Sequence, residues 1–138
     1  MADNIVTLTD ATFQPDGLVL GELAEGFGRL VAGGEVGNIL TTGQVIVGEA
    51  GTGELDLTST TASVDALEIA SLADGDGLAL VWQGAWLGAS AVTVGNAGTG
   101  ALDVLAGGEV VQSGGSSLAV AAAAGSAGDL LVSGAGSR

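Results

Sequence analysis

The sequence contains no cysteine, histidine, lysine or tyrosine, and its 138 residues include only two Trp, two Phe and one Pro. Without cysteine, the chain can form neither a disulfide framework nor a thiolate site. Most of the usual nucleophiles and general bases are also missing, so carboxylates, hydroxyls and two Arg are the reactive groups that remain. A core of Val, Leu, Ile and Ala with so few aromatic anchors is expected to be thin and regular.

Positive charge is almost absent. Arg29 and Arg138 stand against 16 acidic residues, and the net charge is -14. Proteins that bind nucleic acid neutralise phosphates with Lys and Arg, so no nucleic-acid partner is expected. Binding to an anionic membrane surface is not expected either. The acidity favours solubility and discourages nonspecific aggregation of a β-rich chain.

Long apolar runs are also lacking. The longest, residues 118–124, is too short to cross a bilayer, so no membrane insertion is expected. Residues 1–4 lack the basic and apolar regions of a secretory signal. We therefore expect a soluble chain whose export depends on another signal, a removed segment or a parent protein.

The sequence does contain an internal repeat. Residues 45–57, VIVGEAGTGELDL, match residues 92–104, VTVGNAGTGALDV, without a gap. Residues 20–36 match residues 94–110 in the same way, and both segments end in Ala-Gly-Gly-Glu-Val. Weaker copies, with turns about two residues longer, begin at Leu67 and Leu118. The period of roughly 22–27 residues is typical of solenoids. Coils are expected to begin near Leu18, Val45, Leu67, Val92 and Leu118.

Each copy consists of a short alternating strand, a Gly-rich turn and a second alternating strand. A segment rich in Gly, Ser and Thr, such as residues 112–117, then returns the chain to the next coil. Alternation places one set of side chains inward and the other in solvent. The residues expected inward are Val45, Val47, Leu55, Leu57, Val92, Val94, Leu102 and Val104, with Leu78 and Leu80 in the matching frame.

The repeat predicts an all-β fold, a parallel β-helix (β-solenoid) of about five coils. We expect a right-handed coil because parallel crossovers favour that hand. A hairpin meander would need two-residue Asn-Gly or Asp-Gly turns between matched strands, and none is found. Residues 1–17 are expected to form a strand and a turn, and residues 18–138 the repeat domain. The Ala run 121–124 is expected to end a strand and begin a turn, since a short isolated run nucleates a helix poorly.

The repeat also predicts which charges stack on one another. Asp56 and Asp103 are expected to share a column, with Ala79 between them and Leu131 after them. Their repulsion would be mostly screened in physiological salt, because alternate coils lie about a Debye length apart. Arg29 is expected to align with Asp103, in an outward frame.

Two segments carry a resemblance to known proteins. Residues 92–110 read V-x-V-G-x-x-G-x-G-x-L-x-V-x-x-G-G-x-V, and residues 125–137 read G-S-x-G-x-L-x-V-S-G-x-G-S. At these motifs the chain resembles the repeat of bacterial autotransporter passengers and PEP-CTERM-associated surface proteins, over about residues 18–137. The resemblance implies a β-helix in an exported, cell-surface or extracellular setting, with a stalk, adhesin or matrix role. It implies no catalytic residue.

The candidate catalytic and metal-binding residues are few. Asp74 and Asp76 are the best pair for glycoside hydrolysis by two carboxylates. A solvated turn that uses Asp and Gly for their turn chemistry is the favoured interpretation, since no third polar group or substrate platform is evident. The same pair, or Glu49 near Gly51, would bind Ca²⁺ only weakly, because Ca²⁺ takes six to eight oxygen ligands. We predict no catalytic, cofactor or metal site.

Three further features of the sequence bear on binding. Trp82 continues the parity of Leu78 and Leu80 and is expected inward or at a corner, whereas Trp86 is the better surface candidate for a sugar ring, a partner or a neighbouring fibre. Gly48, Gly51 and Gly53 superficially resemble a phosphate loop. No Gly-Lys-Ser/Thr follows them, and the repeat period explains these glycines.

The sequence supports three functional hypotheses. The first is a non-enzymatic extracellular subunit that stacks end to end on itself into a filament or surface fibre. Its basis is that no terminal amphipathic helix is seen that would cover the open strand edges of the stack. The second is a fragment of an autotransporter-like adhesin stalk, with a surface glycan or a protein as partner. The third is a glycan-active β-helix enzyme.

Overall fold

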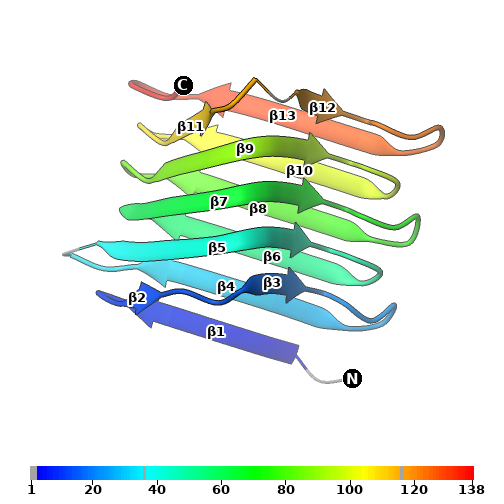
Figure 1. Cartoon of the computed structure of the whole chain (residues 1–138), viewed down its shortest axis with the longest axis horizontal. Helices are drawn as coiled ribbons and strands as arrows, with labels where there is room; N and C mark the ends of the chain where they lie inside the picture. Colours follow the sequence, from blue (N-terminus) through cyan, green and yellow to red (C-terminus); the bar gives the residue numbers. More distant parts are fainter. Residues whose placement is uncertain (1–2, 36, 116) are drawn as a thin grey trace.

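The computed structural model describes residues 3–35, 37–115 and 117–138. In these residues the regular structure consists of strands and turns, without a helix. The strands form two sheets that face each other and are joined by turns on both sides (Figure 1). Every strand pairing is parallel. The predicted all-β parallel solenoid of about five coils is therefore confirmed.

The first sheet, here called sheet A, contains six strands in the order in which the chain forms them. Each neighbour in the sheet is one coil further along the sequence. A sequence repeat produces this arrangement when each coil hydrogen-bonds to the next one along the chain. The strands are β1 (Asp3–Thr9), β4 (Phe27–Gly33), β6 (Thr52–Thr58), β8 (Asp76–Trp82), β10 (Thr99–Leu105) and β13 (Ala127–Ser133).

The second sheet, sheet B, has five levels. The three middle levels are single long strands, β5 (Asn38–Val47), β7 (Thr60–Ile69) and β9 (Trp86–Val94). The first level is divided into β2 (Thr12–Phe13) and β3 (Gly17–Leu20), and the last into β11 (Glu109–Gln112) and β12 (Leu118–Val120).

The return segments of the middle coils are therefore strands, which the sequence did not predict. Thr and Ser recur in these segments, and they fit a half-exposed pleated surface as well as a loop. The pairing of β5 with β7 passes from Thr42 and Val64 to Gln44 and Ala66, skipping one residue on each strand. In the first coil the level is divided between Phe13 and Gly17, and in the last coil between Gln112 and Leu118.

The coil is right-handed, as expected. In Figure 1 the chain runs to the right along the nearer sheet B and to the left along the farther sheet A, while it climbs from β1 to β13. That path is a right-handed helix, the hand that parallel crossovers favour.

The core between the two sheets is narrow and apolar. All eight residues predicted to face inward are at most 1% exposed. The predicted coil starts are also confirmed, because Leu18, Val45, Leu67, Val92 and Leu118 form one column. Residues 121–124 follow the end of β12 as a turn, as predicted, and not as a helix.

The register of the third coil differs from the prediction by one residue. Gly77 pairs with Gly53 and Gly100, which places Ala79 and Val81 in the core. Leu78 and Leu80 therefore point outward and are only half-buried. The prediction placed the larger apolar side chains in the core. The alignment of the glycines instead determines which side chains of the strand point inward. In the Asp56 and Asp103 column the intervening residue is consequently Leu80, not Ala79, while Leu131 follows as predicted.

The predicted column of Arg29 is also wrong, by two residues. The turns 21–26, 70–75 and 121–126 are two residues longer than the turns 48–51 and 95–98. The first coil thus has a long turn, which the ungapped match to residues 94–110 did not allow for. Arg29 lies beside Glu54 instead of in the Asp103 column, although it stays on the outer side of its strand.

Candidate assembly interface

The last coil leaves core-facing side chains open to solvent. Leu118 and Val120 are 47% and 42% exposed, whereas Val92 and Val94, one coil below in the same columns, are at most 1% exposed. On the opposite sheet, Leu130 and Val132 are likewise exposed above buried partners. Leu118, Leu130 and Val132, together with Val110 and Arg138, line a hollow of about 200 Å³.

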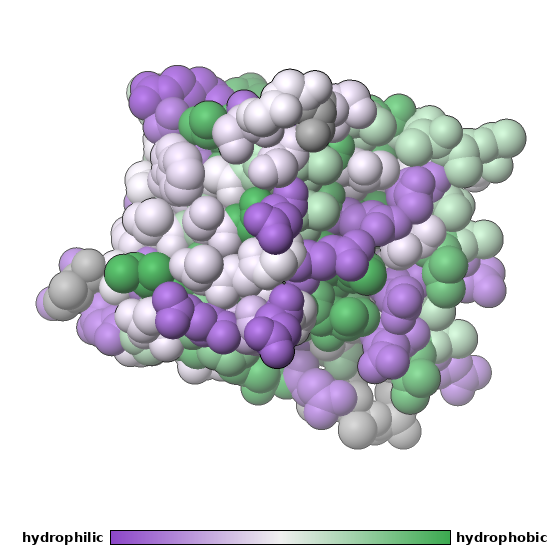
Figure 2. Space-filling model, in the orientation of Figure 1, coloured by the Kyte–Doolittle hydropathy of each residue, from purple (hydrophilic) through white to green (hydrophobic). Residues whose placement is uncertain are grey.

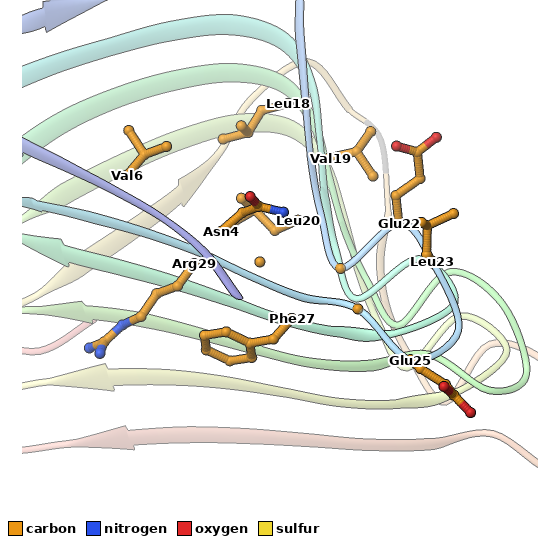
Figure 3. A pocket seen from close by; sticks show the side chains of 13 residues that line it. Asn4, Val6, Leu18, Val19, Leu20, Glu22, Leu23, Glu25, Phe27 and Arg29 are labelled. Atoms are coloured by element: carbon orange, nitrogen blue, oxygen red, sulfur yellow. The ribbon is translucent and has the colours of Figure 1, made fainter. Parts of the chain in front are cut away.

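The first coil has a similar opening. Val6 is 45% exposed, although it pairs with Leu30, which is 1% exposed. Beside it lies a hollow of about 470 Å³ between β1, β3 and the turn 21–26. Figure 3 shows Val6, Leu18 and Leu20 gathered around this hollow, with Phe27 on its other side. Both ends of the stack therefore present apolar side chains that the middle coils bury.

The backbone at the end of the chain starts a further level of sheet B. The Arg138 amide donates to the Gly108 carbonyl at 3.2 Å, and the Arg138 carbonyl accepts from the Val110 amide at 2.8 Å. This is the bonding pattern of a residue placed beside Glu109 in a parallel sheet. The Arg138 guanidinium also pairs with the Glu109 carboxylate at 2.7 Å.

Charge is distributed unevenly between the two ends. Residues 1–28 contain five acidic residues and no basic one, whereas the charged residues of 109–138 are Glu109, Asp129 and Arg138. Like charges repel most where they are brought together in low dielectric. The two ends therefore differ: one is acidic, and the other is nearly neutral.

The outer face of sheet A holds a charged cluster. Arg29 Nη2 lies 3.1 Å from Glu54 Oε1 and 3.3 Å from Asp56 Oδ2. Trp82 Nε1 donates to Asp56 Oδ1 at 2.8 Å. Trp82 is thus on the outer face, half-buried, at the end of β8 beside the following turn, so the predicted corner position is confirmed and the inward one is wrong. The indole and the guanidinium together supply the hydrogen bonds that a nearly buried carboxylate such as Asp56 needs.

Asp103 lies on the same face in a less favourable setting. It is flanked in its column by Leu80 and Leu131. Burial raises the pKa of the Asp103 carboxyl above its ordinary value, and the nearby Asp129 carboxylate raises it further. The ionised form of Asp103 is therefore disfavoured in the folded chain.

The outer face of sheet B is mostly polar. Figure 2 shows this side as pale residues of intermediate hydropathy crossed by purple hydrophilic ones, with smaller green areas between them. Glu68 accepts hydrogen bonds from Gln44 at 3.3 Å, Ser71 at 2.8 Å and Asn96 at 2.5 Å. Trp86, the predicted surface aromatic, is half-buried, and a Cβ added at Gly88 would lie 2.2 Å from its ring. Its ring therefore packs on the glycine.

The predicted carboxylate pair lies where a turn meets the strand that follows it. Asp74 is in the turn 70–75 and Asp76 begins β8, both exposed, while Glu49 is half-buried in the turn 48–51. Within residues 3–35, 37–115 and 117–138, no group of three or more acidic side chains is arranged to hold a metal ion. The same residues contain no helix long and apolar enough to cross a bilayer.

The three glycines that resemble a phosphate loop are accounted for by close packing. A Cβ at Gly48 would lie 2.2 Å from the Asp76 carbonyl oxygen, and one at Gly51 would lie 2.1 Å from the Leu23 carbonyl oxygen. A Cβ at Gly53 would lie 2.1 Å from the Gly48 amide nitrogen. Each contact is to backbone of the same or an adjacent coil, so the stacking of coils requires these glycines.

Comparisons with known proteins add no relative. No family model matches the chain, and neither a curated protein nor a solved structure shows significant similarity to it.

Proposed function

We propose that the chain is a non-enzymatic structural subunit that stacks end to end on copies of itself. The observation that carries this proposal is the exposure of core-facing apolar side chains at both ends of the solenoid, Val6 at one end and Leu118, Val120, Leu130 and Val132 at the other. Burying such surface stabilises an interface by about 25 cal/mol per Å². A second copy presents the matching columns.

The strands at the two ends of sheet A support in-register stacking. β13 and β1 both have seven residues. If β1 of the next copy continues the frame of the sheet, Leu130 meets Val6 and Val132 meets Leu8, so that apolar columns continue across the joint. Parallel pairing of the two edges would also satisfy backbone groups that are open at the ends.

The uneven charge favours one direction of stacking. Contact between two first coils would bring two acidic ends together, whereas head-to-tail contact places the acidic end against the nearly neutral one. A head-to-tail contact is heterologous and does not close on itself, so it produces a filament. The resemblance to repeats of exported surface proteins supports an extracellular or cell-surface setting for this filament.

The proposal is tested by electron microscopy and light scattering of the purified chain. Sheet A contributes six strands per copy, which at about 4.8 Å each give an axial repeat of about 29 Å. We expect unbranched fibres with that repeat and a strong 4.8 Å reflection along the fibre axis. A chain that stays monomeric at high concentration by both methods would exclude the filament, and the adhesin-stalk hypothesis would replace it.

A further inference from the structure

The turns that lead from sheet B to sheet A alternate between two lengths along the stack, although all of them begin and end in the same two columns. Backbone hydrogen bonds between adjacent coils fix both columns. The Ala70 amide donates to the Val47 carbonyl at 2.8 Å, and the Asp76 amide donates to the Gly51 carbonyl at 3.0 Å. In chain order the turns are 21–26 (long), 48–51 (short), 70–75 (long), 95–98 (short) and 121–126 (long).

The long turns form ridges, and the short turns form grooves between them. On the right of Figure 1, the turns that follow β3, β7 and β12 extend beyond those that follow β5 and β9. Because a turn runs outward and returns, two extra residues carry its tip out by about one residue length, roughly 3.3 Å. Exposure alternates in the same way: residues 22–25 and 72–74 are exposed, whereas residues 49–50 and 96–97 are half-buried. We call this surface, made of the five turns, the ridged edge.

Leucine side chains lie at the tips of two ridges. Leu23 and Leu72 are 72% and 50% exposed. The carbonyl of each accepts a hydrogen bond from the amide of the glycine that closes its turn, at 2.7 and 2.9 Å, so the two leucines have equivalent positions. The short turns instead have a half-buried alanine, Ala50 or Ala97. Apolar side chains are therefore present both on the ridges and in the grooves.

The spacing of the ridges determines which partner fits them. Alternate levels lie about 9.6 Å apart, twice the strand spacing. A second copy of the chain has ridges at the same spacing, and a shift by one level places its ridges opposite the grooves. Sheet A contributes six levels per copy, an even number, so stacked copies keep their ridges on every second level across each joint. The ridged edge is thus complementary to itself along a whole fibre.

We propose that the ridged edge joins two fibres side by side, with the long turns of each fibre entering the grooves of the other. This inference rests on the proposed stacking. Each fibre has one such edge, so the first lateral contact produces a pair of fibres. The contact buries the leucine tips. Acidic side chains of the edge repel one another at low salt and are screened as salt rises, so pairing requires added salt. These side chains are Glu22, Glu25, Glu49 and Asp74.

The first test removes one ridge and keeps both columns. The turn 70–75, ASLADG, is replaced in the full chain by GNAG, the sequence of the short turn 95–98. We expect single fibres to form as before, while the fraction of paired fibres at a fixed raised salt, counted by electron microscopy, falls at least tenfold. The replacement also removes Asp74, a change that by charge alone would promote pairing, so loss of charge does not explain the expected result.

A second test keeps the turn length and changes one side chain. Leu72→Ser removes an apolar tip and should reduce the paired fraction severalfold. Ile39→Ser is the matched control, because Ile39 is 48% exposed on the outer face of sheet B and should not take part in the contact. Both positions are exposed, so both variants should fold, and circular dichroism checks this.

The outcomes separate the two proposals. Fibres of the turn replacement that pair as the unmodified fibres do would overturn the ridged edge as the contact and leave the stacking intact. Equal losses of pairing in the Leu72→Ser and Ile39→Ser variants would overturn it too, since the contact would then not be specific to this edge. If the unmodified chain forms no fibres, the stacking itself is wrong, and the pairing of fibres fails with it.

Discussion

Single glycine residues set the cross-section of the coil. Where each second strand begins, the chain passes so close to the preceding turn that a side chain has no room. At Gly53 and Gly100 an added Cβ would lie 2.1 Å and 2.5 Å from a backbone nitrogen of the same coil. Glycine is required at these two positions because a Cβ would clash with backbone atoms, and not because of a positive φ angle. The column comprises Gly28, Gly53, Gly77, Gly100 and Gly128.

Substitution within this column should be costly. Gly53→Ala forces backbone apart in the middle of the stack, and overpacking of this kind costs about 1–3 kcal/mol or more. Gly33→Ala is the control, because a Cβ there meets only ordinary contacts with Thr58 at 3.6 Å or more. It should leave stability unchanged or raise it by about 0.4–1 kcal/mol. Urea unfolding followed by circular dichroism measures both, and equal effects would contradict the steric explanation.

Asp103 should make stability depend on pH. Its pKa is raised in the folded chain above the ordinary 3.8, so the folded state holds the proton more tightly than the unfolded state does. The stability that this proton provides is present below pH 3.8 and is lost as the pH rises through the raised pKa. Asp103→Asn should therefore raise the melting temperature at pH 7 and change it little at pH 3.

A control for this prediction must make the same change in net charge. Asp65→Asn does so at an exposed position of β7. If it raises the melting temperature at pH 7 as much as Asp103→Asn, the effect comes from total charge. A gain of equal size at pH 3 and pH 7 in the Asp103→Asn variant would also count against local burial as the cause.

Among the elements, strand β4 gives a direct test of whether the first coils pack onto the rest of the stack. Arg29 is the only internal site for trypsin, since the chain has no lysine and Arg138 is the last residue. It lies on a strand paired on both sides, with β1 and β6, and its guanidinium contacts Glu54 and Asp56. Cleavage requires local opening of these pairings, so we expect native chain to resist trypsin at Arg29.

A matched variant places a second site nearby but outside the sheet. Leu23 lies in the turn 21–26 and is 72% exposed. Leu23→Lys should therefore be cut rapidly at the new site, while Arg29 in the same molecule stays protected. Mass spectrometry of a time course distinguishes the two cuts. Rapid cleavage at Arg29 in the unmodified chain would mean that the first coils are not docked.

The strands and their inward side chains are largely predictable from the sequence, because identical residues at identical spacing must occupy identical columns. The prediction was wrong where the size of the side chains in one strand and the alignment of that strand with its neighbours point to different inward residues. Leu78 and Leu80 are larger than Ala79 and Val81, yet Gly77 must align with Gly53, and this alignment turns the leucines outward. The glycine column was the signal in the sequence that would have corrected the register.

The candidate interface is less predictable than the fold. Open strand edges follow from a repeat without covering helices, and the sequence indicates that much. The unequal number of levels in the two sheets does not follow from it, because the return segments look like loops. Residues such as Thr41 and Ser63 are strand residues only because neighbouring coils pair with them.

For the whole molecule, the net charge of -14 opposes contact between the sides of fibres, whereas the apolar ends favour contact between copies along the fibre. Salt screens repulsion between the sides of fibres but leaves short-range backbone pairing at their ends nearly intact. We expect long single fibres at low salt and lateral bundles as salt rises, observed by electron microscopy and turbidity. Fibres that shorten steadily with added salt would contradict the expectation that salt leaves the pairing at the fibre joints intact.

Substitutions in the terminal strand should shorten the fibres. Val132→Pro removes a backbone donor from β13, and Leu131→Lys places a charge on its open edge; both changes obstruct strand pairing. Leu78→Lys adds the same charge to the outer side of β8, an internal strand, and is the control. Fibre length distributions should fall for the two β13 variants only. Equal shortening by all three would indicate a general effect of charge.

Sheet A has one level more than sheet B, so one copy exceeds a whole number of coils by about half a turn, and this half-turn sets a rule for joining copies in one polypeptide. Strand β1 begins on one side of the cross-section, and the chain finishes on the other (Figure 1). A direct tandem fusion would have to cross the full width of sheet B between copies. That distance is about eight residues of extended chain at about 3.3 Å each. A shorter linker would strain the joint, whereas a linker of strand length with inward apolar residues would become part of the sheet that it connects.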